Sequence, residues 1–224
     1  MFFLLFDIDG TLIHSGGAGA RALNRAFKIK FDIDEAMAVI NPHGQTDIAI
    51  VEEIFLKKLF RKPSWQETEE ILNLYVNFLG EEVSRAEKYR VLPYVEETLD
   101  ILSAKLEFCL GLATGNIERG ARIKLERGGL NKYFPFGGFG SDHRERWRIV
   151  RRAVERGIEL TGQEPDAVFV IGDTPLDIRA GRRAGYRTVG VATSIYSAEE
   201  LQKDSPDFVI STINELISIL PAQD

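Results

Sequence analysis

Short apolar runs recur along the chain and alternate with segments of helical periodicity. Most of the runs are nearly continuous, which is typical of strands buried on both faces of a parallel sheet. The intervening segments place apolar residues three to four positions apart, and two of them end at glycines, as helices do. The sequence therefore predicts a doubly wound, Rossmann-like α/β fold with a parallel sheet and right-handed crossovers. We expect strands at residues 2–6, 106–113, 167–172, 186–192 and 207–211, helices at 95–106, 117–129, 146–157 and 177–185, and a turn at 135–140.

One part of the chain breaks this alternation. Between residues 15 and 88 the pattern shows helical stretches and no convincing strand. Ser64 and Glu67 form a capping-box pattern, which predicts that the last of these helices begins there. We therefore expect two units: an α/β core made of residues 1–14 and 89–224, and an α-helical unit, residues 15–88, inserted after the first strand.

Polar residues gather where three of the predicted strands end. The segments are DIDGT at 7–11, TGN at 114–116 and GDTPLD at 172–177. Turn and helix-cap chemistry explains each segment taken alone. In an open parallel sheet, however, ligands bind outside the carboxyl ends of the strands. The coincidence of three such segments at one predicted edge therefore indicates a binding or catalytic site.

Asp7 and Asp9 suggest the chemistry of that site. Residues two apart in a strand point to the same side, so their negative charges would repel each other. A hard divalent cation with oxygen ligands would relieve the repulsion, and Asp173 is a third candidate ligand. The chain can also turn after the strand, so that one aspartate contributes its backbone carbonyl. No cysteine or histidine lies in the three segments, which argues against zinc.

Composition and charge narrow the function classes. The chain of 224 residues is 44% hydrophobic and 28% charged, as globular proteins are, and its net charge is −6. That charge argues against a general nucleic-acid or membrane binder, although a local metal still allows an anionic substrate. No apolar run approaches the roughly 20 residues of a membrane span, and residues 1–6 are too short for a signal peptide. Because the single cysteine, Cys109, cannot form an internal disulfide, we expect a cytoplasmic protein.

The order of these motifs resembles the haloacid dehalogenase-like (HAD) hydrolase superfamily. DxDGTL at 7–12 is followed by a threonine that ends the next apolar strand, and then by GDTxxD at 172–177. The resemblance extends over essentially the whole chain, and the helical insertion looks like the type 1 cap of that family. It implies a Mg²⁺-dependent phosphatase that hydrolyses a small phosphomonoester, similar to phosphoglycolate phosphatase, through an aspartyl-phosphate intermediate.

The resemblance also implies roles for individual residues. Asp7 would be the nucleophile and Asp9 the general acid and base. Mg²⁺ would be held by the Asp7 carboxylate, the Asp9 backbone carbonyl and Asp173, with Asp177 in a supporting role. The phosphate oxygens would be bound by side chains and backbone N–H groups of Thr114, Gly10, Gly115 and Asn116. Thr11 is expected to be a turn or cap hydroxyl.

One family feature differs here. The family usually places a lysine ahead of the helix before GDxxxD, but residues 140–157 contain none. Some relatives that look like phosphoglycolate phosphatase carry an arginine there. Arg146 fits best by its distance to the helix, and Arg144 is the second choice. A guanidinium can bridge two oxygens of a carboxylate or phosphate, so the replacement is chemically sensible.

The insertion contains one further candidate. HGQTD at 43–47 resembles a G-x-T-D turn that faces the active site in related caps, so Gly44, Gln45 and Thr46 are candidate substrate-binding residues. The simpler interpretation is that Thr46 or Asp47 caps a helix.

Three alternatives stay open at this point. A phosphomutase would differ only in the group that receives the phosphoryl group. A haloacid dehalogenase would need neither Asp9 nor the metal ligands. A non-catalytic binding module on the same fold is the third, because fold does not fix function. The sequence predicts neither the physiological substrate nor the oligomeric state.

Overall fold

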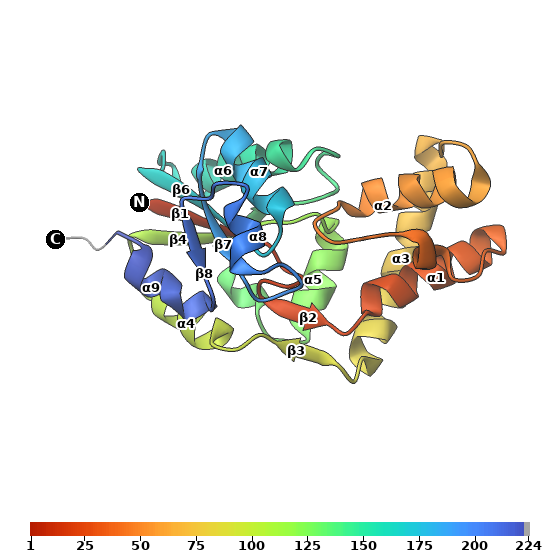
Figure 1. Cartoon of the computed structure of the whole chain (residues 1–224), viewed down its shortest axis with the longest axis horizontal. Helices are drawn as coiled ribbons and strands as arrows, with labels where there is room; N and C mark the ends of the chain where they lie inside the picture. Colours follow the sequence, from red (N-terminus) through yellow and green to blue (C-terminus); the bar gives the residue numbers. More distant parts are fainter. Residues whose placement is uncertain (222–224) are drawn as a thin grey trace.

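A six-stranded sheet forms the centre of the protein (Figure 1), whose computed structural model describes residues 1–221. The strand order is β5-β4-β1-β6-β7-β8, and every neighbouring pair is parallel. The predicted α/β class and all five expected strands are confirmed. The strands are β1 (Phe2–Phe6), β4 (Phe108–Ala113), β5 (Phe136–Gly138), β6 (Ala167–Gly172), β7 (Arg187–Val191) and β8 (Phe208–Ile210).

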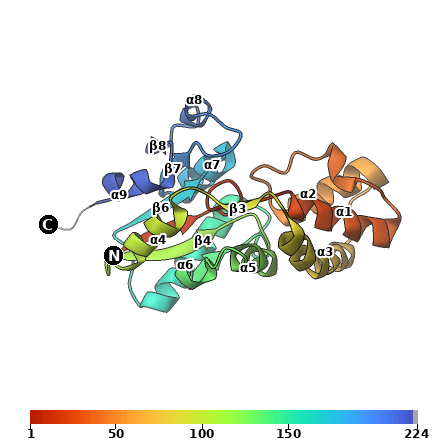
Figure 2. The same ribbon diagram turned by 90° about the horizontal axis from the view of Figure 1, so that it is seen from below.

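Helices cover both faces of this sheet (Figure 2). On β1, Leu4 and Phe6 pack with buried residues of α4 and α5, whereas Phe3 and Leu5 face α6 and α7. This two-sided burial explains why the apolar run of β1 is continuous. The bounds are α4 (Val95–Ser103), α5 (Glu118–Glu126), η3 (Asn131–Tyr133), α6 (Arg146–Thr161), α7 (Pro175–Ala184), α8 (Ala198–Gln202), η4 (Ile213–Glu215) and α9 (Leu216–Ile219).

The expectation of a turn at 135–140 is wrong. Residues 136–138 form the short edge strand β5, which pairs with β4. Glycines hide it from a pattern search, yet they are needed there: a Cβ on Gly138 would lie 2.0 Å from the carbonyl oxygen of Ile149. Glycine therefore lets α6 pack directly onto the strand. The sequence pattern also gave no sign of a small antiparallel pair, β2 (Ile13–Ser15) with β3 (Tyr89–Val91).

A helical segment, residues 18–85, lies between β2 and β3. It contains α1 (Ala18–Phe31), η1 (Ala36–Val39), α2 (Asp47–Ile54), η2 (Phe55–Leu59) and α3 (Trp65–Arg85). The predicted capping box begins α3: Glu67 N–H donates to Ser64 Oγ (3.2 Å), and Ser64 N–H donates to Glu67 Oε2 (2.8 Å). The segment has an apolar cluster of its own, in which Phe27 and Phe55 are fully buried. It packs beside the sheet rather than over it (Figure 1).

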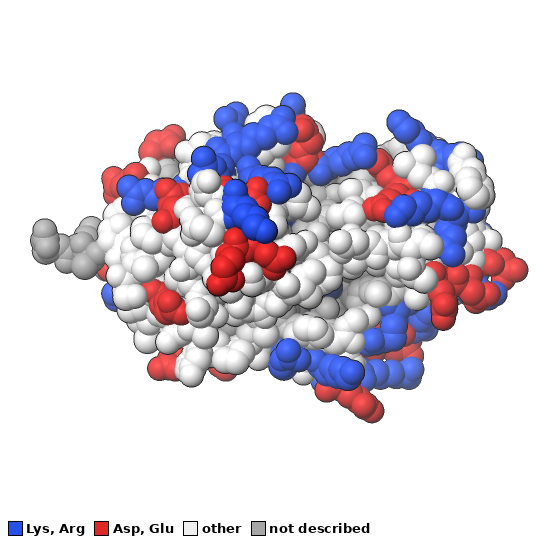
Figure 3. All heavy atoms as spheres, viewed as in Figure 1, with Lys and Arg blue, Asp and Glu red and all other residues white. Residues whose placement is uncertain are grey.

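Basic and acidic side chains are both present on the surface (Figure 3), as the modest net charge of −6 leads one to expect. Lysine and arginine side chains gather over α6 and α7 on the face shown in Figure 3, and acidic side chains lie among them. No helix in residues 1–221 is long and apolar enough to cross a bilayer.

Candidate active site

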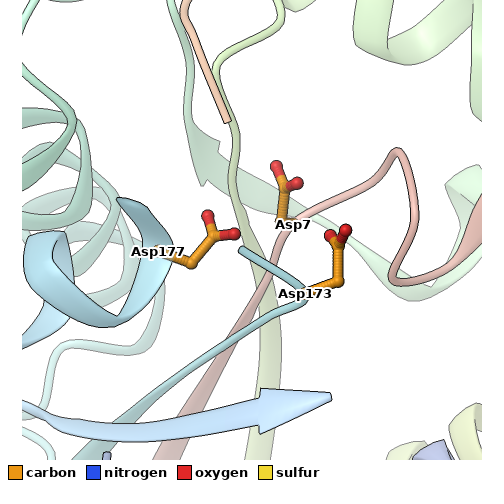
Figure 4. A group of neighbouring side chains, drawn as sticks. All are labelled: Asp7, Asp173 and Asp177. Carbon is orange, nitrogen blue, oxygen red and sulfur yellow. The ribbon is translucent and has the colours of Figure 1, made fainter. Parts of the chain in front are cut away.

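Three buried carboxyl groups meet at the carboxyl edge of the sheet. Asp7 follows β1, Asp173 follows β6, and Asp177 lies in the first turn of α7. One oxygen from each lies within 4.8 Å of the others, and the three side chains surround a common space (Figure 4). Asp177 also belongs to a capping box, because its Oδ2 accepts from the Thr174 hydroxyl (2.7 Å) and backbone N–H (3.1 Å). The structure thus brings together two strand ends and a helix start predicted from the motifs.

The electrostatics of this cluster fit a divalent cation. Burial and the neighbouring Asp177 raise the pKa of Asp7 to about 7, and the same two causes raise the pKa of Asp173 to about 8. The guanidinium of Arg146 balances only part of the negative charge. In addition, no group among residues 1–221 donates a hydrogen bond to the Asp9 carbonyl oxygen. Carboxylate and carbonyl oxygens in this number suit Mg²⁺.

Two neighbours hold Asp173 in place. Thr11, which the motif alone marks only as a turn or cap residue, donates from its hydroxyl to Asp173 Oδ1 at 3.0 Å. Gly10 has φ +90°, and a Cβ there would lie 2.3 Å from Asp173 Oδ2. Only glycine therefore allows the loop after β1 to approach the Asp173 carboxylate so closely.

Asp9 faces different partners. Its Oδ2 accepts from Lys124 Nζ at 2.6 Å and from Asn116 Nδ2 at 3.0 Å, and Lys124 also donates to Asn116 Oδ1 at 2.6 Å. Although burial opposes the shift, Lys124 lowers the pKa of the Asp9 carboxyl. Asp9 is thus held as a carboxylate beside the cluster.

Lys124 is the residue that the sequence analysis missed. It lies on α5 and is only 5% exposed. Gly120 and Ala121, one helical turn before it, are buried on the same helix face. A lysine at a core-facing position of a helix was the available signal, because such a group needs a buried partner.

The loop after β4 is shaped by Thr114. Its side chain is fully buried, and its Oγ1 accepts from the backbone N–H (3.3 Å) and Nδ2 (2.8 Å) of Asn116. Gly115 and Asn116 line the cavity at this edge of the sheet, and Thr114 is not among the residues that line it.

Arg146, at the start of α6, joins the carboxylate cluster. Its guanidinium contacts Asp177 Oδ1 and lies 3.4 Å from Asp7 Oδ1. Its Nη1 donates to the carbonyl oxygen of Gly44, in the helical segment, at 3.1 Å. Arg144 points elsewhere: its side chain is 62% exposed and pairs with Glu52 at 2.9 Å. Of the two candidate arginines, the structure places only Arg146 in the site.

The turn at 43–47 docks on the core beside the carboxylates. Asp47 donates its backbone N–H to the Gly115 carbonyl (2.9 Å), and its Oδ2 accepts from Ile117 N–H (2.8 Å). Gly44 and Gln45 line the cavity. Thr46 is 2% exposed, caps α2 by accepting from Ala49 N–H (3.2 Å), and is not among the lining residues.

The Asp47 contact leads to a prediction on pH and stability. Burial raises the pKa of Asp47 to about 6, so its contribution to stability is full below pH 4 and is lost as the pH rises through 6. Asp47→Asn keeps an oxygen for Ile117 N–H without the charge. We expect wild type to lose about 2–3 kcal/mol of unfolding free energy relative to this variant between pH 4 and 7.

Urea unfolding at several pH values measures this difference. Asp34→Asn, on the surface of the helical segment, controls for the loss of a negative charge. A constant difference between wild type and Asp47→Asn over this range would contradict the assigned environment of Asp47.

A cavity of about 470 Å³ joins these groups. One wall of the cavity comes from the core and the other from the helical segment. A cavity of this volume can hold a small molecule. A second hollow, beside α4, is open to solvent and lies away from the carboxylates. Core residues lining the site cavity include Asp7, Asp9, Lys124, Arg146 and Asp173, and residues of the helical segment include Gly19, Leu23, Met37, Ile50 and Tyr75.

Comparison with known proteins places this site in a family. Residues 4–185 match the haloacid dehalogenase-like hydrolases. The chain is 30% identical over 223 residues to a phosphoglycolate phosphatase of Aquifex aeolicus, covering 98% of this chain and 97% of that protein. It is 25% identical to the pyrophosphatase PpaX of Anoxybacillus flavithermus, covering 97% and 95%. The fold resembles that of CbbY from Rhodobacter sphaeroides in complex with phosphate (TM-score 0.72, 18% identity, 96% and 95% covered).

The chain therefore belongs to the haloacid dehalogenase-like hydrolases. The predicted enzyme class is confirmed: it is a phosphatase of that family.

Proposed function

We propose that the protein is a Mg²⁺-dependent phosphatase that hydrolyses a small phosphomonoester through an aspartyl-phosphate on Asp7. One observation carries this proposal: Asp7 shares a buried space with Asp173, Asp177 and the Arg146 guanidinium, while Asp9 stands beside it in a separate hydrogen-bond network. These groups would supply a nucleophile, a charge clamp and an acid–base group at one edge of the sheet.

The first step uses Asp7 as the nucleophile. Its carboxylate oxygen forms a bond to phosphorus while the bond from phosphorus to the ester oxygen breaks. Asp9 in its protonated form, which the contact with Lys124 disfavours, donates a proton to the departing oxygen, so that a neutral alcohol leaves. Arg146, 3.4 Å from Asp7 Oδ1, is placed to bind the phosphate oxygens as charge builds on them.

The second step uses Asp9 as a base. It takes a proton from a water molecule that attacks phosphorus, which breaks the bond to Asp7 and releases phosphate. The contact with Lys124 favours the ionised form of Asp9 that this step requires. The backbone N–H of Gly115 is a further candidate to hold a phosphate oxygen, in a loop shaped by Thr114. The Gly10 N–H already donates to the Ile13 carbonyl, and both N–H bonds of the Asn116 side chain are already donated, to Asp9 and Thr114.

Asp7, Asp173 and the Asp9 carbonyl are the groups that would hold Mg²⁺, with Asp177 supporting. When bound, the ion would neutralise the charge between nucleophile and phosphate.

The helical segment is proposed to act as a cap. In this assignment residues 15–88 form the cap, and residues 1–14 and 89–224 form the catalytic core. The docked turn at 43–47 supports it, because Gly44 contacts Arg146 and closes one side of the cavity. A closed cap would exclude bulk water from the phosphoryl group.

The proposed substrate is a small phosphate compound. Support comes from the cavity of about 470 Å³ and from the relatives named phosphoglycolate phosphatase and pyrophosphatase. A cytoplasmic location is a proposal that rests on the composition.

Metal removal tests the proposal directly. We expect the purified protein to hydrolyse p-nitrophenyl phosphate in Mg²⁺, to lose this activity in excess chelator and to regain it when Mg²⁺ is restored. Mg²⁺ should also raise the Tm, because it binds the folded carboxylate cluster.

Released phosphate identifies a phosphatase, whereas transfer to a second sugar phosphate would identify a phosphomutase. Full activity in chelator, or halide release from a 2-haloacid, would contradict the proposed chemistry.

A further inference from the structure

A helix N-terminus with free donors lies in the wall of the cavity. α1 begins at Ala18, and its N-cap, Gly17, has φ +78° and provides no side-chain cap. Within residues 1–221, the first three backbone N–H groups of the helix (residues 18–20) have no acceptor. Gly17, Gly19 and Ala20 all line the cavity. The positive end of a helix of this length is therefore presented to whatever the cavity holds.

A buried hydroxyl at the same place has no partner. Tyr75, on α3, is 1% exposed and lines the cavity. Within residues 1–221 its hydroxyl forms no hydrogen bond with another residue, and Asp47, Lys124 and Asp9 are the charged groups near it. Because Tyr75 lines the cavity, a water molecule or a ligand atom there can supply the partner that this hydroxyl needs.

Lys124 adds a charged donor to the hydroxyl. An ammonium has three N–H bonds, and Asp9 and Asn116 accept two of them. A Cβ on Gly19 would lie 3.6 Å from Lys124 Nζ and 3.7 Å from Tyr75 Oη. The missing side chain of Gly19 thus leaves room for one atom in contact with both groups.

We propose that this place, formed by the α1 N-terminus, Tyr75 and Lys124, binds a second anionic group of the substrate. The proposal rests on the proposed phosphatase function and specifies its substrate class: a phosphate compound that carries a carboxylate or a second phosphate on its leaving part. Helix amides, a hydroxyl and an ammonium are the donors that such oxygens accept.

The position of Lys124 limits the distance between the phosphoryl group of the substrate and its second anionic group. Its Nζ also lies 2.6 Å from the Asp9 carboxylate, the group proposed to protonate the leaving oxygen. The second anion is therefore only a few bonds from the bond that is cleaved, and the substrate is short. The charge of Lys124 is balanced by Asp9 and by the nearby Asp47, so the helix amides and the Tyr75 hydroxyl are needed to complete the site.

Two substitutions test the subsite without touching Asp9. Tyr75→Phe removes only the unpartnered hydroxyl. Gly19→Ala places a methyl group in the space for the anion at ordinary contact distances, so the fold should tolerate it. Gly80→Ala is the matched control, because Gly80 lies within α3 and a Cβ there meets no atom within 4 Å. Thermal unfolding verifies that each variant is folded.

The measurement is kcat/KM for phosphoglycolate and for pyrophosphate, each relative to ethyl phosphate, which lacks the second anion. In wild type we expect a ratio of about 10 or more for at least one of them, since a charge-assisted hydrogen bond typically contributes a factor of this size. Tyr75→Phe and Gly19→Ala should each lower the ratio by about 3- to 10-fold, and Gly80→Ala should not. A preference for phosphoglycolate alone identifies a carboxylate site, and one for pyrophosphate alone identifies a phosphate site.

Two results would overturn the subsite: a wild-type ratio near one for both compounds, or ratios that neither substitution changes. If no phosphate ester is hydrolysed at all, the proposed function fails instead. Calorimetry then still tests the subsite, because 3-phosphonopropionate should bind wild type more tightly than propylphosphonate does, and Gly19→Ala should abolish the difference.

Discussion

Replacing Asp7 with asparagine is expected to lower kcat for p-nitrophenyl phosphate by about 10⁴-fold or more, as loss of a nucleophile does in other hydrolases. The amide cannot form the acyl phosphate, and no other carboxylate occupies its position at the end of β1. The fold should survive. Asp7→Asn removes one of three neighbouring buried negative charges, and burial together with Asp177 already disfavours its ionised form. The Tm of the variant without metal should therefore equal or exceed that of wild type.

Two measurements make this result interpretable. Thermal unfolding shows whether the inactive variant is folded, and Asp34→Asn, at an exposed position, controls for the general effect of the substitution. Undiminished turnover in a folded Asp7→Asn protein would refute the nucleophile assignment. It would leave Asp173 and Asp177 as metal ligands for an attack by water.

Substitution of Arg146 by alanine should have the next largest effect. Loss of a guanidinium that faces the phosphoryl group is expected to lower kcat/KM by about 10²- to 10³-fold. The change also leaves Asp7 and Asp177 without their cation and removes a donor from the Gly44 carbonyl. Breaking a buried ion pair from one side typically costs about 3–5 kcal/mol of stability, so chemical denaturation should detect it.

Arg144→Ala provides the comparison. This arginine is mostly exposed and pairs with Glu52, and such surface pairs contribute at most about 1 kcal/mol. Its activity and stability should stay close to those of wild type. If Arg144→Ala proved more damaging than Arg146→Ala, the basic position of the site would have to move by two residues.

The strands and the carboxylate cluster could be predicted from the sequence because both depend on residues that are close together along the chain. A continuous apolar run marks a strand buried on two faces, and the residues directly after it lie at the carboxyl edge of the sheet. Asp7 and Asp173 therefore meet wherever β1 and β6 are neighbours, as they are here. The edge strand β5 could not be predicted, because its glycines reflect the close packing of α6 on the strand. The sequence of residues 136–138 does not indicate this packing.

The partners of the site residues could not be predicted in the same way. Lys124 reaches Asp9 from a position 115 residues away, and Arg146 reaches Gly44 across 102 residues. Such contacts depend on how α5 and the helical segment are oriented on the core. For the same reason the sequence motif named Thr11 as a turn residue, and only the fold shows that its hydroxyl supports Asp173.

The docking of the turn at 43–47 has a consequence for how this protein can change over evolution. Two of the contacts that hold the turn to the core use backbone atoms: the Gly44 carbonyl with Arg146, and the Asp47 N–H with the Gly115 carbonyl. These contacts do not depend on which side chains the turn carries at neighbouring positions such as Gln45. Substitutions there can alter which leaving group fits the cavity while the turn still closes on the residues proposed to be catalytic. A change of substrate preference through the turn would therefore leave the proposed chemical step intact.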